Sequence, residues 1–323
     1  MYVIMLNPKI LFMPNIFLLS VRTSSLIMAG YYRGKYTAEI ITEDSNKDNT
    51  CMKIPRLIGG LMTQHNETII LSGGKLDRIC KQLDKGWTWK YHSTLNRNRF
   101  GASVVSTSKT TFIFGGYDFN NGSTFEYLAK DSFTWVLGKT DIPNGFRNGA
   151  AIAVKSEKEI WLIGGHNNKK RILCFNVEDH TFEELPFRLN IGRNLHRCAY
   201  IPGTKKVMIA GGFNDNDCKY LNSTEVLDPE DESIILTSPM NFKRSDCGIG
   251  VVTIKGEDKL AVAGGKNRGK FLRNVEIFDE KTQKWKKTHL KLDKQKEGHQ
   301  PSFLSVKLGI LYDMYSSESK PLK

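Results

Sequence analysis

The sequence predicts an all-β protein built from a repeated unit of four short strands. Its apolar runs are short and are bounded by Gly, Asn, Asp and Lys, which is typical of strands joined by turns. No apolar pattern with a helical period is long enough to indicate a substantial helix. A strand that ends in two glycines recurs along the chain, and such a recurrence indicates a repeat architecture.

The glycine-terminated strand is the clearest part of the repeat. Its full copies are TIILSGG, TTFIFGG, EIWLIGG, KVMIAGG and KLAVAGG, and a weaker copy, SLIMAG, precedes them. The final glycines of successive copies are 42 to 53 residues apart. Glycine allows a sharp bend and a close approach of neighbouring backbone, so we interpret these residues as structural. They are Gly30, Gly73, Gly74, Gly115, Gly116, Gly164, Gly165, Gly211, Gly212, Gly264 and Gly265.

Each repeat continues with further matching segments. After the glycines and a polar loop comes a second strand, as in YTAEII, STFEYL, STEVLD and NVEIFD. A turn then leads to an aromatic residue, and an arginine precedes the first strand of the next repeat. The aromatic residues are Trp89, Trp135, Phe182 and Trp285, and the arginines are Arg56, Arg99, Arg147, Arg193 and Arg244. We label the four strands of a unit a to d.

Together these features resemble the kelch repeat, over about residues 26 to 306. The glycine pair after an apolar strand, the aromatic residue of the fourth strand and a period of about 50 residues are its marks. The resemblance implies a β-propeller, in which four-stranded blades surround a central axis. Three positions depart from the pattern. Ala29 replaces a first glycine, Phe182 replaces a tryptophan, and SIILTS (233–238) lacks the fourth-strand tryptophan.

Counting strands predicts one ring of six blades. There are six b strands, but the first has no a strand before it, and a spare a strand, QPSFLSVKL (300–308), follows the last unit. Closing the ring with this strand removes the exposed ends. We therefore expect a six-bladed β-propeller of four-stranded antiparallel blades over residues 26–308, closed by a C-terminal strand. Residues 309–323 are expected to form a C-terminal tail.

Residues 1–25 have two interpretations. A lysine, an apolar stretch at 10–21 and the small residues Ser24 and Ser25 have the layout of a secretory signal peptide. The alternative is an irregular or strand-forming N-terminus. Pro14 and Asn15 interrupt the apolar stretch, which is too short to predict a membrane span. The protein would be secreted in the first case and cytoplasmic in the second. Its six cysteines have no C-x-x-C spacing and allow disulfides without requiring them.

The charge of the chain favours an anionic partner. The formal net charge is +13. In an antiparallel four-stranded blade, the b–c loops and the d–a connections leave the same face of the ring, which we call the b–c/d–a face. The c–d turns on the opposite face are acidic or mixed in charge. The candidate binding residues on the b–c/d–a face are Arg33, Lys35, Arg78, Arg99, Arg147, Lys169, Lys170, Arg171, Arg193, Arg244, Lys266, Arg268 and Lys270. For the arginines that precede each a strand, a structural role is the alternative.

No motif indicates catalysis. GGKNRGKF (264–271) nearly matches a phosphate-binding loop, but Phe271 stands where Ser or Thr is needed, and a strand follows instead of a helix. The seven histidines are scattered with no metal-ligand spacing, and G-x-S-x-G is absent. We therefore expect no enzyme activity, no cofactor and no metal site, and we name no catalytic residue.

Three functions remain to be distinguished. The first is a monomeric, non-catalytic interaction module for an acidic protein segment or an anionic glycan, since no aromatic and basic stripe favours nucleic acid. The second is a secreted glycan- or matrix-binding propeller, with glycans at Asn66, Asn121 or Asn222 and a disulfide at Cys51 or Cys80. The third follows from the resemblance, because some kelch-type propellers are copper oxidases with Tyr and His ligands at their centre.

Overall fold

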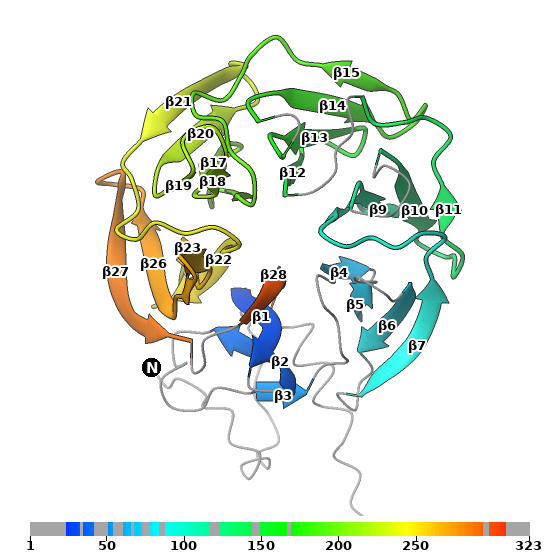
Figure 1. The fold of residues 1–323 in the computed structure, drawn as a ribbon, viewed down its shortest axis with the longest axis horizontal. Coiled ribbons are helices and arrows are strands. Elements are labelled where there is room, and N and C mark those ends of the chain that lie inside the picture. Colours follow the sequence, from blue (N-terminus) through cyan, green and yellow to red (C-terminus); the bar gives the residue numbers. More distant parts are fainter. Residues whose placement is uncertain are drawn as a thin grey trace, which may run out of the picture.

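The strands of this protein surround a common axis. A computed structural model describes residues 24–32, 35–41, 51–53, 61–65, 68–72, 78–83, 88–116, 123–143, 149–166, 169–292 and 297–307. Within these ranges the strands form six four-stranded antiparallel sheets and two small hairpins (Figure 1). No helix found there is long and apolar enough to cross a membrane. The predicted all-β propeller with four-stranded antiparallel blades is confirmed.

Five sheets, blades II to VI, are described with their side chains, and their strands pair in chain order from the innermost to the outermost. Blade II consists of β4 (Leu61–His65), β5 (Thr68–Ser72), β6 (Ile79–Leu83) and β7 (Trp89–Thr94). Blade III consists of β8 (Ser103–Ser106), β9 (Thr110–Phe114), β10 (Phe125–Ala129) and β11 (Val136–Leu137). Blade IV consists of β12 (Ala151–Val154), β13 (Glu159–Ile163), β14 (Ile172–Asn176) and β15 (Phe182–Glu184).

Blades V and VI each carry a small hairpin between strands b and c, which the sequence analysis did not predict. Blade V consists of β16 (Arg197–Tyr200), β17 (Val207–Ala210), β20 (Thr224–Asp228) and β21 (Ser233–Thr237). Its hairpin consists of β18 (Phe213–Asn214) and β19 (Lys219–Tyr220). Blade VI consists of β22 (Gly248–Ile254), β23 (Glu257–Ala263), β26 (Asn274–Asp279) and β27 (Lys284–Lys291). Its hairpin consists of β24 (Lys266–Asn267) and β25 (Lys270–Phe271), so GGKNRGKF forms a hairpin.

The remaining sheet, sheet I, joins the two ends of the described chain. Its strands, in spatial order, are β28 (Glu297–Lys307), β1 (Ser24–Tyr32), β2 (Lys35–Ile41) and β3 (Cys51–Lys53). The predicted spare strand is β28, and it pairs antiparallel with the first b strand, with Leu304 opposite Ile27. It also lies beside β22 and β4, the innermost strands of blades VI and II (Figure 1). Residues 1–23 and 308–323, which include most of the predicted leader and the whole tail, lie outside the described residues.

The core lies between neighbouring blades, where two sheet faces meet. Between blades III and IV the rings of Phe112, Phe114 and Phe125 pack against Phe175, with ring centroids 5.0 to 5.4 Å from Phe175. Trp135 of blade III is buried, and its Nε1 donates a hydrogen bond to Ser93 Oγ of blade II at 3.0 Å. Because aromatic rings bury large apolar areas, these contacts hold adjacent blades together.

The described glycine pairs have the geometry expected of structural residues. In the pairs ending at Gly116, Gly165, Gly212 and Gly265, every φ lies between +60° and +101°. A Cβ built on Gly212 would lie 2.6 Å from the carbonyl oxygen of Asn194. A side chain therefore fits neither the backbone conformation nor the space. Gly73 and Gly74 lie outside the described residues, and Gly30 lies within β1.

Candidate functional site

A buried arginine–glutamate pair holds the d–a connection against the blade that follows it. The Arg–Glu nitrogen–oxygen distances are 3.0, 2.6 and 2.7 Å in blades III, V and VI, and these side chains are at most 2% exposed. The pairs are Arg99–Glu126, Arg193–Glu225 and Arg244–Glu276. Nη1 of each arginine also donates to the carbonyl oxygen of the first glycine of its blade, at 2.7 to 2.8 Å. The pair therefore ties the start of strand a to the ends of strands b and c.

An asparagine three residues before each arginine completes the arrangement. In blade V the backbone N and Nδ2 of Asn190 donate to Glu225 Oε2 at 2.7 and 3.0 Å. The backbone N of Ile191 donates to Glu225 Oε1 at 3.2 Å. Asn96 and Asn241 make the same two bonds to the glutamates of blades III and VI. Burying a carboxylate is costly, and these donors offset part of that cost.

Three predicted binding residues are therefore structural. The prediction that Arg99, Arg193 and Arg244 contact a partner is wrong, because their side chains are enclosed by their own blades. Burial lowers the pKa of the Arg193 guanidinium, and the charge of Glu225 opposes that shift. The signal was present in the sequence, since Asn-x-x-Arg recurs with a glutamate in strand c of the same blade.

Blades II and IV lack this glutamate. In the register of blades III, V and VI, the glutamate lies opposite the b-strand residue two positions before the first glycine. These glutamates are Glu126, Glu225 and Glu276. The corresponding c-strand residues are Lys81 in blade II and Leu173 in blade IV. Arg147, the predicted binding residue that precedes strand a of blade IV, lies outside the described residues. The ionic arrangement thus belongs to three of the five blades with described side chains.

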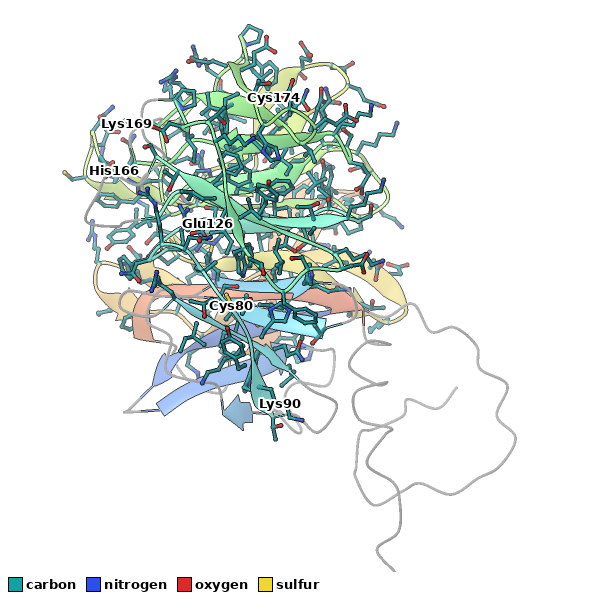
Figure 2. The ribbon with its side chains drawn as sticks, turned by 90° about the vertical axis from the view of Figure 1, so that its right-hand side faces the viewer. Cys80, Lys90, Glu126, His166, Lys169 and Cys174 are labelled. Atoms are coloured by element: carbon teal, nitrogen blue, oxygen red, sulfur yellow. The ribbon has the colours of Figure 1, made fainter. Side chains whose placement is uncertain are left out.

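Three predicted cations, and two further lysines of the same loops, are exposed on the b–c/d–a face. Within the described part of the chain, these side chains are exposed and make no ion pair: Lys170, Lys219, Lys243, Arg268 and Lys270. Backbone bonds join the b–c loop of blade IV to the next d–a connection, since Leu189 N donates to Lys170 O and Arg193 N to Lys169 O. Figure 2 shows His166 and Lys169 on the same side of the ring. The two kinds of loop therefore meet on one face in blade IV, as predicted.

The remaining predicted cations are engaged within the chain or lie outside the described residues. Lys169 Nζ donates to Asn216 Oδ1 at 2.6 Å, and Lys266 Nζ lies 3.3 Å from Asp246 Oδ2. Arg171 pairs with Glu184, and Arg78 Nη1 donates to the carbonyl oxygen of Asn96 at 3.0 Å. Arg33 lies outside the described residues, and only the backbone of Lys35 is described, in β2.

Acidic groups, which were not among the predicted residues, lie on the same face. In the hairpin of blade V, Asp215 Oδ2 accepts a hydrogen bond from Asn194 Nδ2 at 2.7 Å and lies 3.3 Å from His166 Nδ1. Asp217 is exposed beside it. The sequence signal is the segment FNDNDCKY, which contains both Asp215 and Asp217. The exposed cations of blades IV and VI therefore flank an acidic hairpin.

A chain of backbone hydrogen bonds runs between blades at the start of strand a. Leu195 N donates to Gly149 O at 2.6 Å, and Asp246 N donates to Leu195 O at 2.9 Å. Gly149 N donates in turn to Gly101 O at 3.4 Å. All four residues have a left-handed φ, between +50° and +74°. Each stands two residues after the arginine that precedes its a strand, so the repeat itself generates this inner rim.

The described cysteines and one sequon bear on the secreted alternative. Cys80, Cys174, Cys198, Cys218 and Cys247 are free thiols, so the disulfide predicted for Cys80 is not formed, and Cys51 is described by its backbone alone. Asn222 Nδ2 donates to the carbonyl oxygen of Met240 at 3.0 Å, and Thr224 of the same sequon is buried. Asn66 and Asn121 lie outside the described residues. Among the side chains that the structure describes, no three His, Cys, Asp or Glu are grouped to hold a metal ion.

Comparisons with known proteins agree with the repeat. Residues 101–311 match the family described as the KLHDC2/KLHL20/DRC7 Kelch-repeats domain. A stretch of 188 residues is 24% identical to a RING finger domain and kelch repeat-containing protein of Dictyostelium discoideum, and covers 57% of this chain and 18% of that protein. A stretch of 98 residues is 33% identical to the F-box/kelch-repeat protein SKIP20 of Arabidopsis thaliana, and covers 30% of this chain and 23% of that protein. The chain thus matches less than a quarter of the length of either relative.

Proposed function

Because the chain belongs to the kelch-repeat family, whose propellers are commonly protein-interaction modules, we propose that it is a non-catalytic module that binds an acidic protein segment through its b–c/d–a face. The exposed cations of blades IV, V and VI carry this proposal. Lys170, Lys219, Arg268 and Lys270 have no ion-pair partner among the described residues, so their charges are available to a ligand. An anionic glycan is the other ligand with this chemistry.

The local arrangement supports a specific surface over a diffuse charge. Lys169 is held by Asn216, and the backbone of the same loop is bonded to the connection at Leu189 and Arg193. Exposed cations on a fixed backbone lose less conformational entropy on binding than cations on a mobile loop. The acidic hairpin residues Asp215 and Asp217 lie between the exposed cations of blades IV and VI, which favours a partner with two acidic stretches, and a short polyanion can engage either group of cations.

The proposal also includes a closed ring of six blades. Sheet I has the strand number and the antiparallel pairing of the other blades. Its strand β28 lies between β22 and β4, which are innermost strands themselves. We infer that sheet I is the sixth blade and that β28 closes the ring. Closure supports the binding role, because it fixes the loops of blades VI and II relative to each other.

Binding of short anionic probes tests the charged face. The test variant replaces Lys170, Arg268 and Lys270 with Ser, and its matched control replaces Lys109, Lys281 and Lys284, which are exposed at turns of the opposite face or beside one. The probes are a labelled poly-glutamate peptide and a heparin oligosaccharide, each titrated at several salt concentrations. Because screening weakens surface attraction, we expect the test variant to bind poly-glutamate at least about tenfold more weakly at low salt, with a shallower salt dependence.

The control variant loses the same formal charge, so it separates a local surface from net charge. Equal losses in the two variants would contradict the proposal. A loss of heparin binding with unchanged poly-glutamate binding would favour the anionic glycan as the ligand.

A further inference from the structure

The outermost strand of blade V exposes apolar side chains. Strand β21 contains Ser233, Ile234, Ile235, Leu236 and Thr237, and carries no charged residue. Ile235 is 60% exposed and Leu236 is 54% exposed. In the described chain, β21 pairs with β20 alone, so the backbone groups on its other edge have no strand partner (Figure 1).

The equivalent positions of other blades are protected by charge. Register aligns Ile234 with Trp135, Trp285 and the other fourth-strand aromatic residues. The two residues that follow the aromatic are Lys90 and Tyr91 in blade II, Glu183 and Glu184 in blade IV, and Lys286 and Lys287 in blade VI. Charges on an edge strand prevent it from pairing with another strand. Blade III has Val136 and Leu137 there, but β11 is only two residues long.

Strand β21 is nevertheless fixed in position. Ile234 packs against the core between blades IV and V, and its carbonyl oxygen accepts a hydrogen bond from Asn190 Nδ2 at 3.3 Å. Its five residues all pair with β20. An incoming strand would therefore meet an ordered edge, and would not have to order it first.

The ends of β21 differ in charge. The turn that leads into it contains the exposed acidic residues Glu230, Asp231 and Glu232. Glu230 pairs with Lys205 at 2.6 Å, whereas no ion pair within the described chain involves Asp231 or Glu232. The residues after the strand, Ser238 and Pro239, are neutral. A ligand that lies along β21 therefore meets negative charge at one end.

We propose that the outer edge of β21 binds an extended segment of a partner protein as a fifth strand of blade V, antiparallel to β21. Antiparallel pairing continues the pattern of the blade and places the C-terminal end of the segment beside Asp231 and Glu232. The segment thus has alternating apolar residues followed by lysine or arginine. This surface lies at the rim of the ring, and its preference for a basic ligand is opposite to that of the b–c/d–a face.

Binding of a synthetic peptide tests the proposal. The probe is a labelled peptide, Thr-Val-Thr-Ile-Thr-Lys-Lys, titrated by fluorescence anisotropy into the full chain. Ile235→Lys places a charge on the edge, so we expect at least about tenfold weaker binding. The matched control, Val136→Lys, changes an exposed apolar residue at the equivalent position of blade III and should leave the affinity unchanged.

A second comparison tests the direction of the segment. A peptide of reversed order, Lys-Lys-Thr-Ile-Thr-Val-Thr, should bind several-fold more weakly to the wild type. That difference should disappear in the double variant Asp231→Asn and Glu232→Gln. Because Ile235 is exposed, we expect Ile235→Lys to retain the urea midpoint of the wild type, which shows that the fold is intact.

Three outcomes would overturn the proposal. One is unchanged peptide binding by Ile235→Lys, and another is an equal loss in Val136→Lys. The third is a wild-type dimer, seen by light scattering, that Ile235→Lys converts to a monomer, because a second copy would then occupy the edge. Poly-glutamate binding at the b–c/d–a face should be unaffected by Ile235→Lys, so the two proposals can fail separately.

Discussion

Nη2 of Arg193 lies 2.6 Å from Oε1 of Glu225, and both side chains are fully excluded from solvent. Removing one partner leaves the other charge buried without compensation. We expect Arg193→Met and Glu225→Gln each to lower the free energy of unfolding by about 3 to 5 kcal/mol. The double variant should cost clearly less than the sum of the two, because neither charge then remains. Urea denaturation of the four proteins measures this coupling, and additive losses would contradict it.

Glycine at the end of strand b is required by space as well as by φ. Gly212 has a φ of +101°, and a Cβ there would meet the carbonyl oxygen of Asn194 at 2.6 Å. Gly256 has a φ of +75°, but a Cβ would meet nothing within 4 Å. We expect Gly256→Ala to cost about 1 to 2 kcal/mol in the free energy of unfolding. Gly212→Ala should cost more than about 3 kcal/mol, because the steric clash is added to the strain. Equal losses of stability in urea denaturation would show that the left-handed φ alone, and not the lack of space, requires glycine at position 212.

Stability should fall below neutral pH. Burial lowers the pKa of His196 well below its usual 6.5, and burial also lowers the pKa of His65, His92 and His180. The unfolded chain binds protons first as the pH falls, so the free energy of unfolding is constant above about pH 7 and decreases below about pH 6.5. We expect His196→Ala to reduce that decrease. Alanine already occupies the equivalent position in blades III and IV, as Ala102 and Ala150.

Urea midpoints at about pH 7.5 and 5.5 test this prediction, since the histidines of the unfolded chain, with a pKa of about 6.5, become protonated in that interval. The variant retains part of the decrease because the other three histidines still titrate. An identical decrease in the wild type and in His196→Ala would contradict the assignment to His196.

Thiol reactivity should distinguish the cysteines. Burial raises the pKa of Cys80 to about 11 and that of Cys198 to about 12, whereas Cys218 is exposed. Since the thiolate is the reactive form, iodoacetamide at about pH 8 should modify Cys218 rapidly in the folded protein. Cys80 and Cys198 should react only after urea is added. Mass spectrometry of the resulting peptides in a Cys51→Ser background measures each site, and rapid labelling of Cys198 would contradict the prediction.

The proposed closure of the ring by β28 has a measurable consequence. A chain that ends at residue 292 lacks β28, so β1, β22 and β4 lose a neighbour. We expect this chain to unfold at a lower urea concentration than the full chain, because the innermost strand of sheet I is missing. A chain that ends at residue 307 retains β28 and serves as the control. Equal midpoints for the two chains would argue against closure.

The periodic part of the structure was predictable from the sequence. In blades II to VI, each predicted b strand and each predicted c strand is present. The b strands were predictable because an apolar run that ends in glycines leaves few alternatives. The a strand near residue 300 was also correctly paired, since an unpaired b strand requires a neighbour. The hairpin at Lys266–Phe271 was missed. Its turn has Arg268 at a φ of +49° before Gly269, whereas Asn or Asp usually precedes the glycine of such a turn.

The candidate site was less predictable, because formal charge does not specify exposure. Arg193 and Arg268 are both predicted to bind a partner, yet one is buried against Glu225 and the other is exposed in a hairpin. That difference depends on a carboxylate 32 residues away, which only the register of the blade brings close. The cation at Lys266 is partly neutralised by Asp246, again through a tertiary contact.

The residues of the inner rim share one backbone conformation but differ in their side chains. They are Gly101, Gly149, Leu195 and Asp246. Blades III and IV contribute glycine, while blades V and VI contribute an isobutyl group and a carboxylate at the same left-handed position. A main-chain bond links the blades whichever residue is present, so side chains can change there without breaking the link. Blades V and VI therefore carry side chains at this position where blades III and IV carry backbone alone, so the repeated backbone permits different chemistry on two sides of the central axis.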